Sequence, residues 1–181
     1  MIAPVYCRLF IQLPVLCYNH RASLEFNQAQ PLNHEQCVYD MILSVADTEY
    51  EFVRDVLLPY LEIECKQTVY FPARDMTPDC PEIAMCEEHI LKSRNIIIVL
   101  SDGYKNDNLC QVMQLQHIIL PLLYEDKRLD HQLLFILYDK DATLPVITRW
   151  NHNVSKLDWC TYSSQEAKLS SINKWLGTGK L

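Results

Sequence analysis

The chain has 181 residues, 49% of them hydrophobic, and a formal net charge of −7 at pH 7. This length allows one well-buried core and disfavours a second full domain. The negative charge argues against nucleic acid as a partner, because phosphate binding depends on clustered Lys and Arg.

The first 36 residues are expected to form an N-terminal extension, partly packed or a linker. The stretch from Val5 to Tyr18 is apolar, but it contains Arg8 and Pro14 and is shorter than the roughly 20 residues that span a bilayer. We therefore expect no direct membrane span. A secretory signal peptide is the less favoured alternative, since no basic region precedes the apolar run. Residues 19 to 35 show no hydrophobic period and are interpreted as a connector.

A single domain is expected over residues 37–181, where compact apolar runs alternate with helical patterns. This alternation indicates strand–helix–strand units around a parallel sheet. The run Ile96–Leu100 has no polar positions, so we expect it at the centre of the sheet, covered on both faces. We expect five strands in all, and the sequence assigns ranges to four of them: Val38–Val45, Thr68–Phe71, Ile96–Leu100 and Leu133–Tyr138.

Helical patterns fill the intervals between these strands. Asp47 and Thr48, with Glu51 three residues after Thr48, resemble a capping box and predict a helix start. Later helices are predicted after Pro81, over Leu109–Leu123, and from a cap at Ser163 or Ser164. The first helix has an apolar stripe of Val53, Val56, Leu57, Tyr60 and Leu61, and a face interpreted as solvated of Glu49, Glu51, Arg54, Asp55 and Glu62.

The order of elements predicts an α/β fold. We expect a flavodoxin-like three-layer domain with a central five-stranded parallel sheet and about five surrounding helices. Right-handed crossovers would place the functional loops at the carboxyl ends of the strands.

Three local motifs make this order more specific. Tyr39-Asp40-Met41-Ile42-Leu43-Ser44 lies on the first strand, Arg74-Asp75-Met76-Thr77-Pro78-Asp79 follows the second, and Leu100-Ser101-Asp102-Gly103-Tyr104 follows the third. These motifs resemble the first two boxes and the third-strand exit of Toll/interleukin-1 receptor (TIR) domains. The resemblance extends from about Cys37 to Leu176.

The resemblance implies a non-catalytic adaptor or regulator in Toll-like and interleukin-1 receptor innate immune signalling. Its partners would be other TIR domains of receptors or adaptors, and we also weigh a homo-oligomer. The main contact would be the loop from Pro72 to Pro81, whose three prolines lower the entropy lost on docking. The alternative is that Arg74 and Asp75 pair with each other or cap the next helix. The candidate protein-binding residues are Arg74, Asp75, Met76, Thr77, Pro78 and Asp79.

Two acidic positions receive separate interpretations. Asp79 stands where the family has glycine, so the loop turns there without the residue that most readily takes positive φ. Asp40 is a charged residue on a buried strand, and we interpret it as structural, satisfying backbone groups of a loop.

Catalysis is the alternative function. Some TIR domains cleave NAD with a glutamate on the helix after the third strand, and the resemblance places Met113 at that position. Met113 has no carboxylate to stabilise oxocarbenium-like charge. The nearby Gln111, Gln114 and Gln116 are uncharged, and Glu125 lies beyond Pro121. We therefore expect no catalytic residue and no cofactor, and keep a TIR-type NAD+ nucleosidase as the alternative.

The eight cysteines are scattered through predicted core elements rather than through a loop-rich scaffold. We interpret them as free thiols in a reducing cytosol, and so expect a cytoplasmic protein. The nearest grouping to a metal site is Cys80, Cys86 and His89, but isolated Cys and His residues usually only pack in the interior, so no metal is expected. The chain could also be a short isoform or a fragment, which would sequester TIR partners without passing the signal on.

Overall fold

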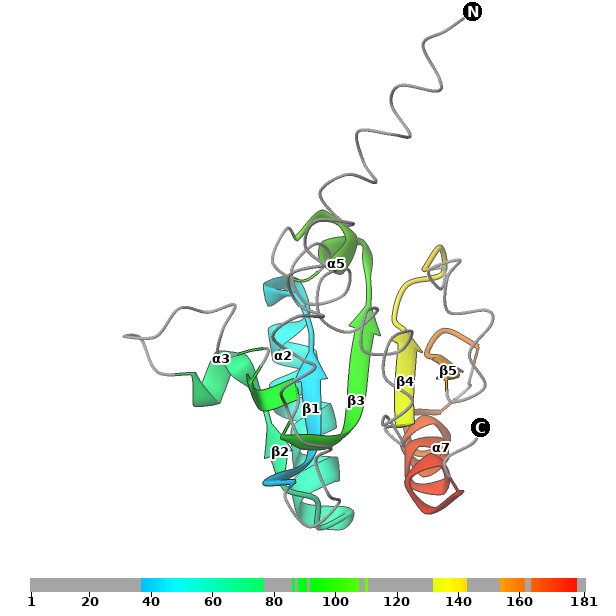
Figure 1. Cartoon of the computed structure of the whole chain (residues 1–181). Coiled ribbons are helices and arrows are strands. Elements are labelled where there is room, and N and C mark those ends of the chain that lie inside the picture. Colours follow the sequence, from blue (N-terminus) through cyan, green and yellow to red (C-terminus); the bar gives the residue numbers. More distant parts are fainter. Residues whose placement is uncertain are drawn as a thin grey trace, which may run out of the picture. The chain divides into compact units, whose positions relative to one another are not determined.

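The computed structural model describes residues 37–76, 86, 88–90, 92–107, 110, 132–142, 154–161 and 164–178. Its strands form one sheet in which every neighbouring pair is parallel, in the order β2-β1-β3-β4-β5 (Figure 1). This order is that of a flavodoxin-like doubly wound domain and confirms the predicted fold class. The strands are β1 (Tyr39–Ser44), β2 (Val69–Tyr70), β3 (Ser93–Leu100), β4 (Gln132–Leu137) and β5 (Val154–Asp158).

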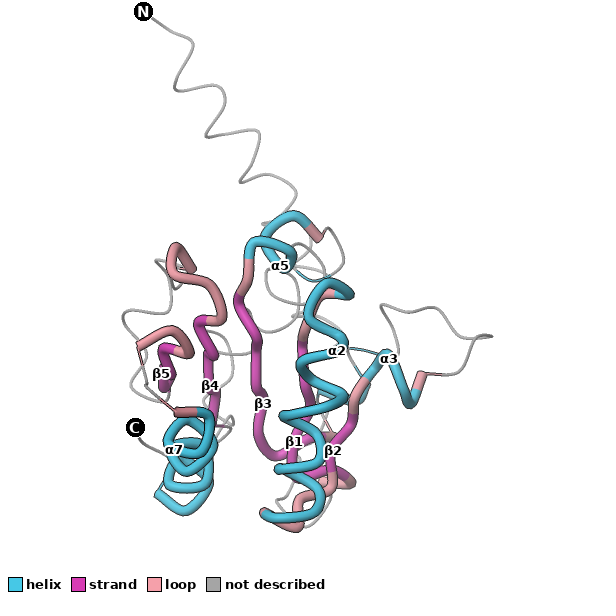
Figure 2. Tube along the Cα trace, turned by 180° about the vertical axis from the view of Figure 1, so that it is seen from behind, coloured by secondary structure: helices cyan, strands magenta, loops and turns pink. Residues whose placement is uncertain are grey.

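A helix built of several segments follows β1 and runs along β1 and β2 (Figure 2). Cys86 and Glu88–Ile90 are helical too, within the helix predicted after Pro81, while Leu109–Leu123 lies outside the described residues apart from Cys110. The helical segments are η2 (Asp47–Glu49), α2 (Tyr50–Phe52), η3 (Val53–Leu57), η4 (Tyr60–Glu64), α3 (Pro72–Asp75), α5 (Asp102–Asn106) and α7 (Gln165–Thr178).

Both faces of the sheet are buried. β3 is the third strand of five, and its residues Ile96–Leu100 are at most 2% exposed, which confirms the predicted centre. Alternate residues point to opposite faces. One face packs against η3, η4 and α7, through Leu43, Ile97 and Leu134 of the sheet together with Leu57, Leu61 and Trp175 of the helices.

The helix after β1 contains π-helical turns, in η3 and again in η4. Val53, Leu57 and Leu61 are fully buried at a spacing of four. The hydrogen bonds of a π turn join residues five apart, so a π turn contains more residues than the 3.6 of an α turn. Where the two kinds of turn alternate, residues four apart therefore stay on one face of the helix. Three members of the predicted apolar stripe are therefore confirmed as core, while Val56 and Tyr60 are half-buried.

The predicted start of this helix is wrong in detail. The N-cap residue is Ala46, with no side-chain cap, and the Thr48 hydroxyl donates to the Glu49 carboxylate (2.6 Å). Glu49, predicted to be solvated, is only 8% exposed. The segment begins as a 3-10 turn, which rotates Glu49 inward relative to the α-helical pattern used for the prediction.

The C-terminal helix begins as predicted. The Ser164 hydroxyl accepts a hydrogen bond from the Ala167 amide (3.2 Å), so Ser164 provides the cap, and Ile172 and Trp175 are fully buried. The second strand is shorter than predicted, and Pro72–Asp75 forms a helical turn rather than irregular loop. Within the described residues, no helix is long and apolar enough to cross a membrane. The extension over residues 1–36 lies outside them.

Candidate protein-binding site at the carboxyl end of β2

The predicted contact segment begins as a tight turn at the carboxyl end of β2. Phe71 is its N-cap residue and Pro72 occupies the first helical position, where its fixed φ and missing N–H suit a helix start. The amides of Arg74 and Asp75 both donate to the Phe71 carbonyl (2.9 Å each). The Met76 amide donates to the Pro72 carbonyl (3.0 Å) and closes the turn.

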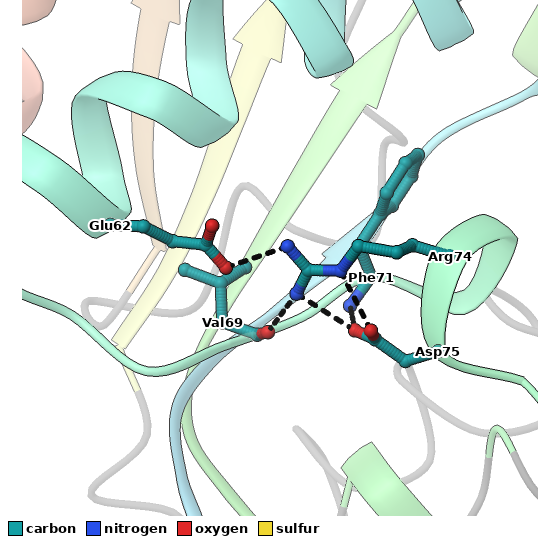
Figure 3. A network of polar contacts seen from close by, with 5 residues as sticks. All are labelled: Glu62, Val69, Phe71, Arg74 and Asp75. Atoms are coloured by element: carbon teal, nitrogen blue, oxygen red, sulfur yellow. Dashed lines mark hydrogen bonds and ion pairs between the residues drawn. The ribbon is translucent and has the colours of Figure 1, made fainter.

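Arg74 lies at the centre of a polar network on this turn (Figure 3). Its Nη1 donates to Glu62 Oε1 (2.8 Å), and its Nη2 donates to the Val69 carbonyl (2.9 Å). Its Nε and Nη2 donate to the two carboxylate oxygens of Asp75 (2.7 and 3.0 Å). The guanidinium therefore joins η4, β2 and α3 at one point.

Asp75 connects this network to the start of the turn. Its Oδ2 accepts a hydrogen bond from the Phe71 amide (2.8 Å), one of the donors that a helix start leaves without an internal partner. The Asp75 carboxylate also raises the pKa of the Arg74 guanidinium, through its hydrogen bond first of all. The pairing of Arg74 with Asp75, weighed as an alternative from the sequence, is what the structure contains.

Glu62 is the member of the network that the sequence did not identify, since its face of the helix was interpreted as solvated. The Glu62 and Arg74 side chains are 35% and 41% exposed, and Asp75 is 27% exposed. Ion pairs at this exposure contribute modestly, at most about 1 kcal/mol each. The network is therefore better suited to fixing the geometry of the turn than to stabilising the fold.

Aromatic side chains pack around the two residues that precede the turn, Tyr70 and Phe71. Phe71 is 1% exposed and stacks on Tyr50 of the preceding helix at 5.7 Å between ring centroids, with the Arg54 guanidinium 5.6 Å from the Tyr50 ring. Tyr70 stacks on His89 at 3.9 Å, and burial raises the pKa of its phenol to about 12. The base of the turn is thus anchored in packed aromatic groups.

The other candidate residues of this segment are only partly described. Met76 is half-buried and leaves the turn with an extended backbone. Thr77, Pro78 and Asp79 lie outside the described residues. The assignment of partner contacts to this segment stays a prediction.

Asp40 has the structural role that its position on β1 suggested. Its Oδ2 accepts hydrogen bonds from the Thr68 amide (2.9 Å) and hydroxyl (2.7 Å), in the segment that leads into β2. Its own amide donates to the Thr68 carbonyl (2.9 Å), and Arg94 approaches its carboxylate at 3.9 Å. The Asp40 carboxylate thus accepts a hydrogen bond from a backbone amide just before the neighbouring strand β2.

The structure describes two residues of the metal-like grouping considered in the sequence, Cys86 and His89. Cys86 is buried, His89 stacks on Tyr70 with Tyr39 beside both rings, and Cys80 lies outside the described residues. Among the residues with described positions, no three His, Cys, Asp or Glu side chains are arranged to hold a metal ion. The five cysteines in those ranges are free thiols: Cys37, Cys65, Cys86, Cys110 and Cys160.

The segment considered for NAD cleavage begins at the carboxyl end of β1. The Cys110 thiol donates to the Val45 carbonyl (3.4 Å), and the Cys110 amide donates to Asp107 Oδ1 (3.0 Å). Burial raises the pKa of the Cys110 thiol, so the folded chain keeps it protonated. Met113, which occupies the position of the catalytic glutamate in the resemblance, lies outside the described residues.

Comparison with solved structures identifies the fold. The TIR domain of the Toll-related receptor TRR-2 from Hydra magnipapillata matches with a TM-score of 0.60 and 23% identity, over 78% of this chain and all of that domain. A TIR-STING receptor from C. gigas matches with a TM-score of 0.54 and 16% identity, over 80% of this chain and 42% of that one. Family models and curated proteins gave no match. The chain therefore has the fold of TIR domains.

Proposed function

We propose that this chain is a non-catalytic signalling module that binds other TIR domains, and that its contact segment is Arg74–Asp79, whose first residues lie on the turn at the carboxyl end of β2. The observation that supports this is the placement of the Arg74-Asp75 motif. It lies on a tight turn at the carboxyl end of a sheet strand, where doubly wound domains carry their functional loops.

The likeness to a Toll-related receptor supports a signalling role. We propose that the partners are TIR domains of Toll-like receptors, interleukin-1 receptors or their adaptors, in the cytoplasm. Val99-Leu100-Ser101-Asp102-Gly103-Tyr104, followed by Cys110-Gln111, most resembles the myeloid differentiation primary response adaptor. In this segment the Ser101 hydroxyl accepts a hydrogen bond from the Tyr104 amide and caps α5 (2.9 Å).

Binding is tested with purified domains. The chain is immobilised, and the TIR domains of Toll-like receptors, interleukin-1 receptors, their adaptors and Hydra TRR-2 are passed over it, with the chain itself as an additional analyte. We expect dissociation constants on the order of 1–100 μM with at least one of them, as is usual for small transient interfaces. No measurable binding to any TIR domain would contradict the proposal.

The segment is tested by placing the same new side chain at two sites. Pro78→His is expected to abolish binding with little change in the thermal midpoint. Asn173→His is the matched control, because Asn173 is exposed on α7, which packs beside β5 at the opposite edge of the sheet from β2. If both variants bind like the parent chain, partners contact another surface.

The enzymatic alternative has its own assay. The purified chain is incubated with NAD, and nicotinamide release is followed by chromatography. We expect no turnover, because the resemblance leaves the catalytic glutamate position to Met113. Turnover that survives Met113→Ala but is lost when a carboxylate elsewhere is changed to its amide would establish an NAD-cleaving enzyme.

A further inference from the structure

We propose that Glu62, on η4 and outside the predicted contact segment, positions the turn Pro72–Asp75, where that segment begins, by fixing the Arg74 guanidinium. This inference rests on the proposed function. It gives Arg74 a positioning role, in which its effect on partner affinity is transmitted through the turn rather than by touching the partner.

The contacts of Arg74 come from different parts of the fold. Val69 and Asp75 lie within five residues of Arg74 along the chain, on the strand and turn that it joins. Glu62 lies twelve residues away, on the helix that packs beside the sheet. In the polar network, the Glu62 contact alone ties the turn to the helix (Figure 3).

The hydrogen bonds of the Arg74 guanidinium fix its orientation as well as its position. Arg74 uses Nε, Nη1 and Nη2 toward three acceptor residues. Because the guanidinium is planar and rigid, contacts along three directions fix its plane as well as its position. Asp75 passes this orientation to the backbone, since the oxygen that accepts from Nη2 also accepts from the Phe71 amide.

The charges of the network support a positioning role for Arg74. One guanidinium lies between two carboxylates, at 2.8 Å from Glu62 and 2.7 Å from Asp75. Both carboxylates are already paired with the one cation, which therefore has most of its donors engaged within the chain. A partner carboxylate would have to displace one of them before it could bind Arg74 bidentately.

The matched control lies on the same helical segment. Glu64 is an exposed carboxylate two residues after Glu62, within η4. Glu62→Ala and Glu64→Ala remove the same group from the same segment, and differ in that only Glu62 contacts the turn. Arg74→Ala and the double variant Glu62→Ala/Arg74→Ala complete a cycle that measures whether the two residues act together.

The first readout is made on the free chain by amide hydrogen exchange. Glu62→Ala is expected to speed exchange of the Phe71, Asp75 and Met76 amides about three- to tenfold, while Glu64→Ala changes them less than about twofold. Glu62→Gln keeps an acceptor oxygen without the charge, and should fall between the two. Unchanged exchange in Glu62→Ala would overturn the inference whether or not a partner has been found.

The second readout is affinity for the TIR domain that binds the parent chain best. Glu62→Ala is expected to weaken binding about three- to tenfold, and to have no further effect when Arg74 is already alanine. If Arg74→Ala weakens binding while Glu62→Ala does not, Arg74 contacts the partner directly and the inference is wrong. If the parent chain binds no TIR domain, the proposed function fails, and the exchange measurement alone decides the role of Glu62.

Discussion

The hydroxyls of Ser44 and Tyr104 form a hydrogen bond of 2.7 Å in the core, between residues that are 60 positions apart in the chain. Ser44 ends β1, and Tyr104 lies on α5 immediately after β3. Both are buried, and Tyr104 has no exposed surface. This contact joins the carboxyl end of β1 to the helix that follows β3. It lies at the carboxyl edge of the sheet, the same edge that carries the Arg74 turn.

The first prediction concerns this contact. Tyr104→Phe is expected to lower the free energy of unfolding by about 1–2 kcal/mol, because a buried hydrogen bond is lost and the Ser44 hydroxyl keeps less of its pairing. Chemical denaturation measures the change. Adding Ser44→Ala to Tyr104→Phe should cost less than the sum of the single changes, and strict additivity would show that the two hydroxyls are not coupled.

The second prediction concerns alkaline pH. Burial raises the pKa of Cys110, Tyr70 and Tyr104 above the ordinary values of about 8.5 for Cys and 10 for Tyr. At a pH above its ordinary pKa, each group stays protonated in the folded chain but ionises in the unfolded chain. Their contribution is therefore complete below pH 8.5 and is lost as pH rises.

Denaturation in reducing buffer between pH 7 and 11 measures this loss. Stability should begin to fall near pH 9 as the Cys110 thiol becomes ionisable in the unfolded chain, and more steeply above pH 10 when the phenols join, by up to about 1.4 kcal/mol per pH unit for each group. Cys110→Ala should flatten the profile between pH 9 and 10. The matched control is Cys160→Ala, which removes an exposed thiol. A flat parent profile up to pH 11 would contradict the prediction.

The third prediction concerns Gly103, where α5 passes close to η2. A Cβ at this position would lie 1.9 Å from Thr48 Oγ1 and 3.0 Å from Thr48 Cβ. Gly103→Ala is expected to destabilise the chain by about 1–3 kcal/mol, because the two segments must move apart. Adding Thr48→Ala removes the closest atom and should recover part of the loss.

Gly177 provides the control for this glycine. It lies within α7, and a Cβ there would have no atom within 4 Å apart from its chain neighbours and the backbone of its own helix. Gly177→Ala should therefore stabilise the chain by about 0.5–1 kcal/mol, through the unfolded-state entropy of glycine. Equal thermal midpoints for the two alanine variants would show that the approach at Gly103 is not tight.

The fold was largely predictable because each central strand can be identified from its own short stretch of sequence. Ile96–Leu100 is an unbroken apolar run, and β3 is buried along that whole length. The residue range of the fifth strand could not be predicted from the sequence, because Val154–Asp158 is an edge strand in which only Leu157 is buried. Such a strand is defined by hydrogen bonds to β4, which the sequence pattern does not contain.

The candidate site was predictable only where its residues are neighbours. The pairing of Arg74 with Asp75 joins adjacent residues, whereas Glu62 reaches Arg74 across twelve positions. No helical or strand spacing links such a pair. The π turns of η3 and η4 add to the difficulty, since their register departs from the 3.6-residue period used to assign faces.

The last prediction concerns Lys66, at the end of the helix that carries Glu62. Its φ is +56°, in the left-handed region where glycine is unstrained. The Gln67 amide donates to the Leu61 carbonyl (3.0 Å) across this residue, one residue further back than in a Schellman helix end, as the π-helical turn of η4 requires. Lys66→Gly should raise the free energy of unfolding by about 0.5–1 kcal/mol, because relief of the left-handed strain outweighs the added entropy of the unfolded chain.

Lys66→Ala is the matched control, since alanine removes the same long charged side chain but keeps the Cβ that is strained at this φ. Urea denaturation should show Lys66→Gly above the parent chain and Lys66→Ala at or below it. If both variants gain equally, the lysine side chain rather than the backbone conformation is the cause. Lys66 lies only four residues after Glu62, but the contacts of Arg74 go to Glu62, Val69 and Asp75. The glycine variant should therefore keep the exchange rates of the Arg74 turn. This result would separate the stability of the helix end from the positioning of the contact segment.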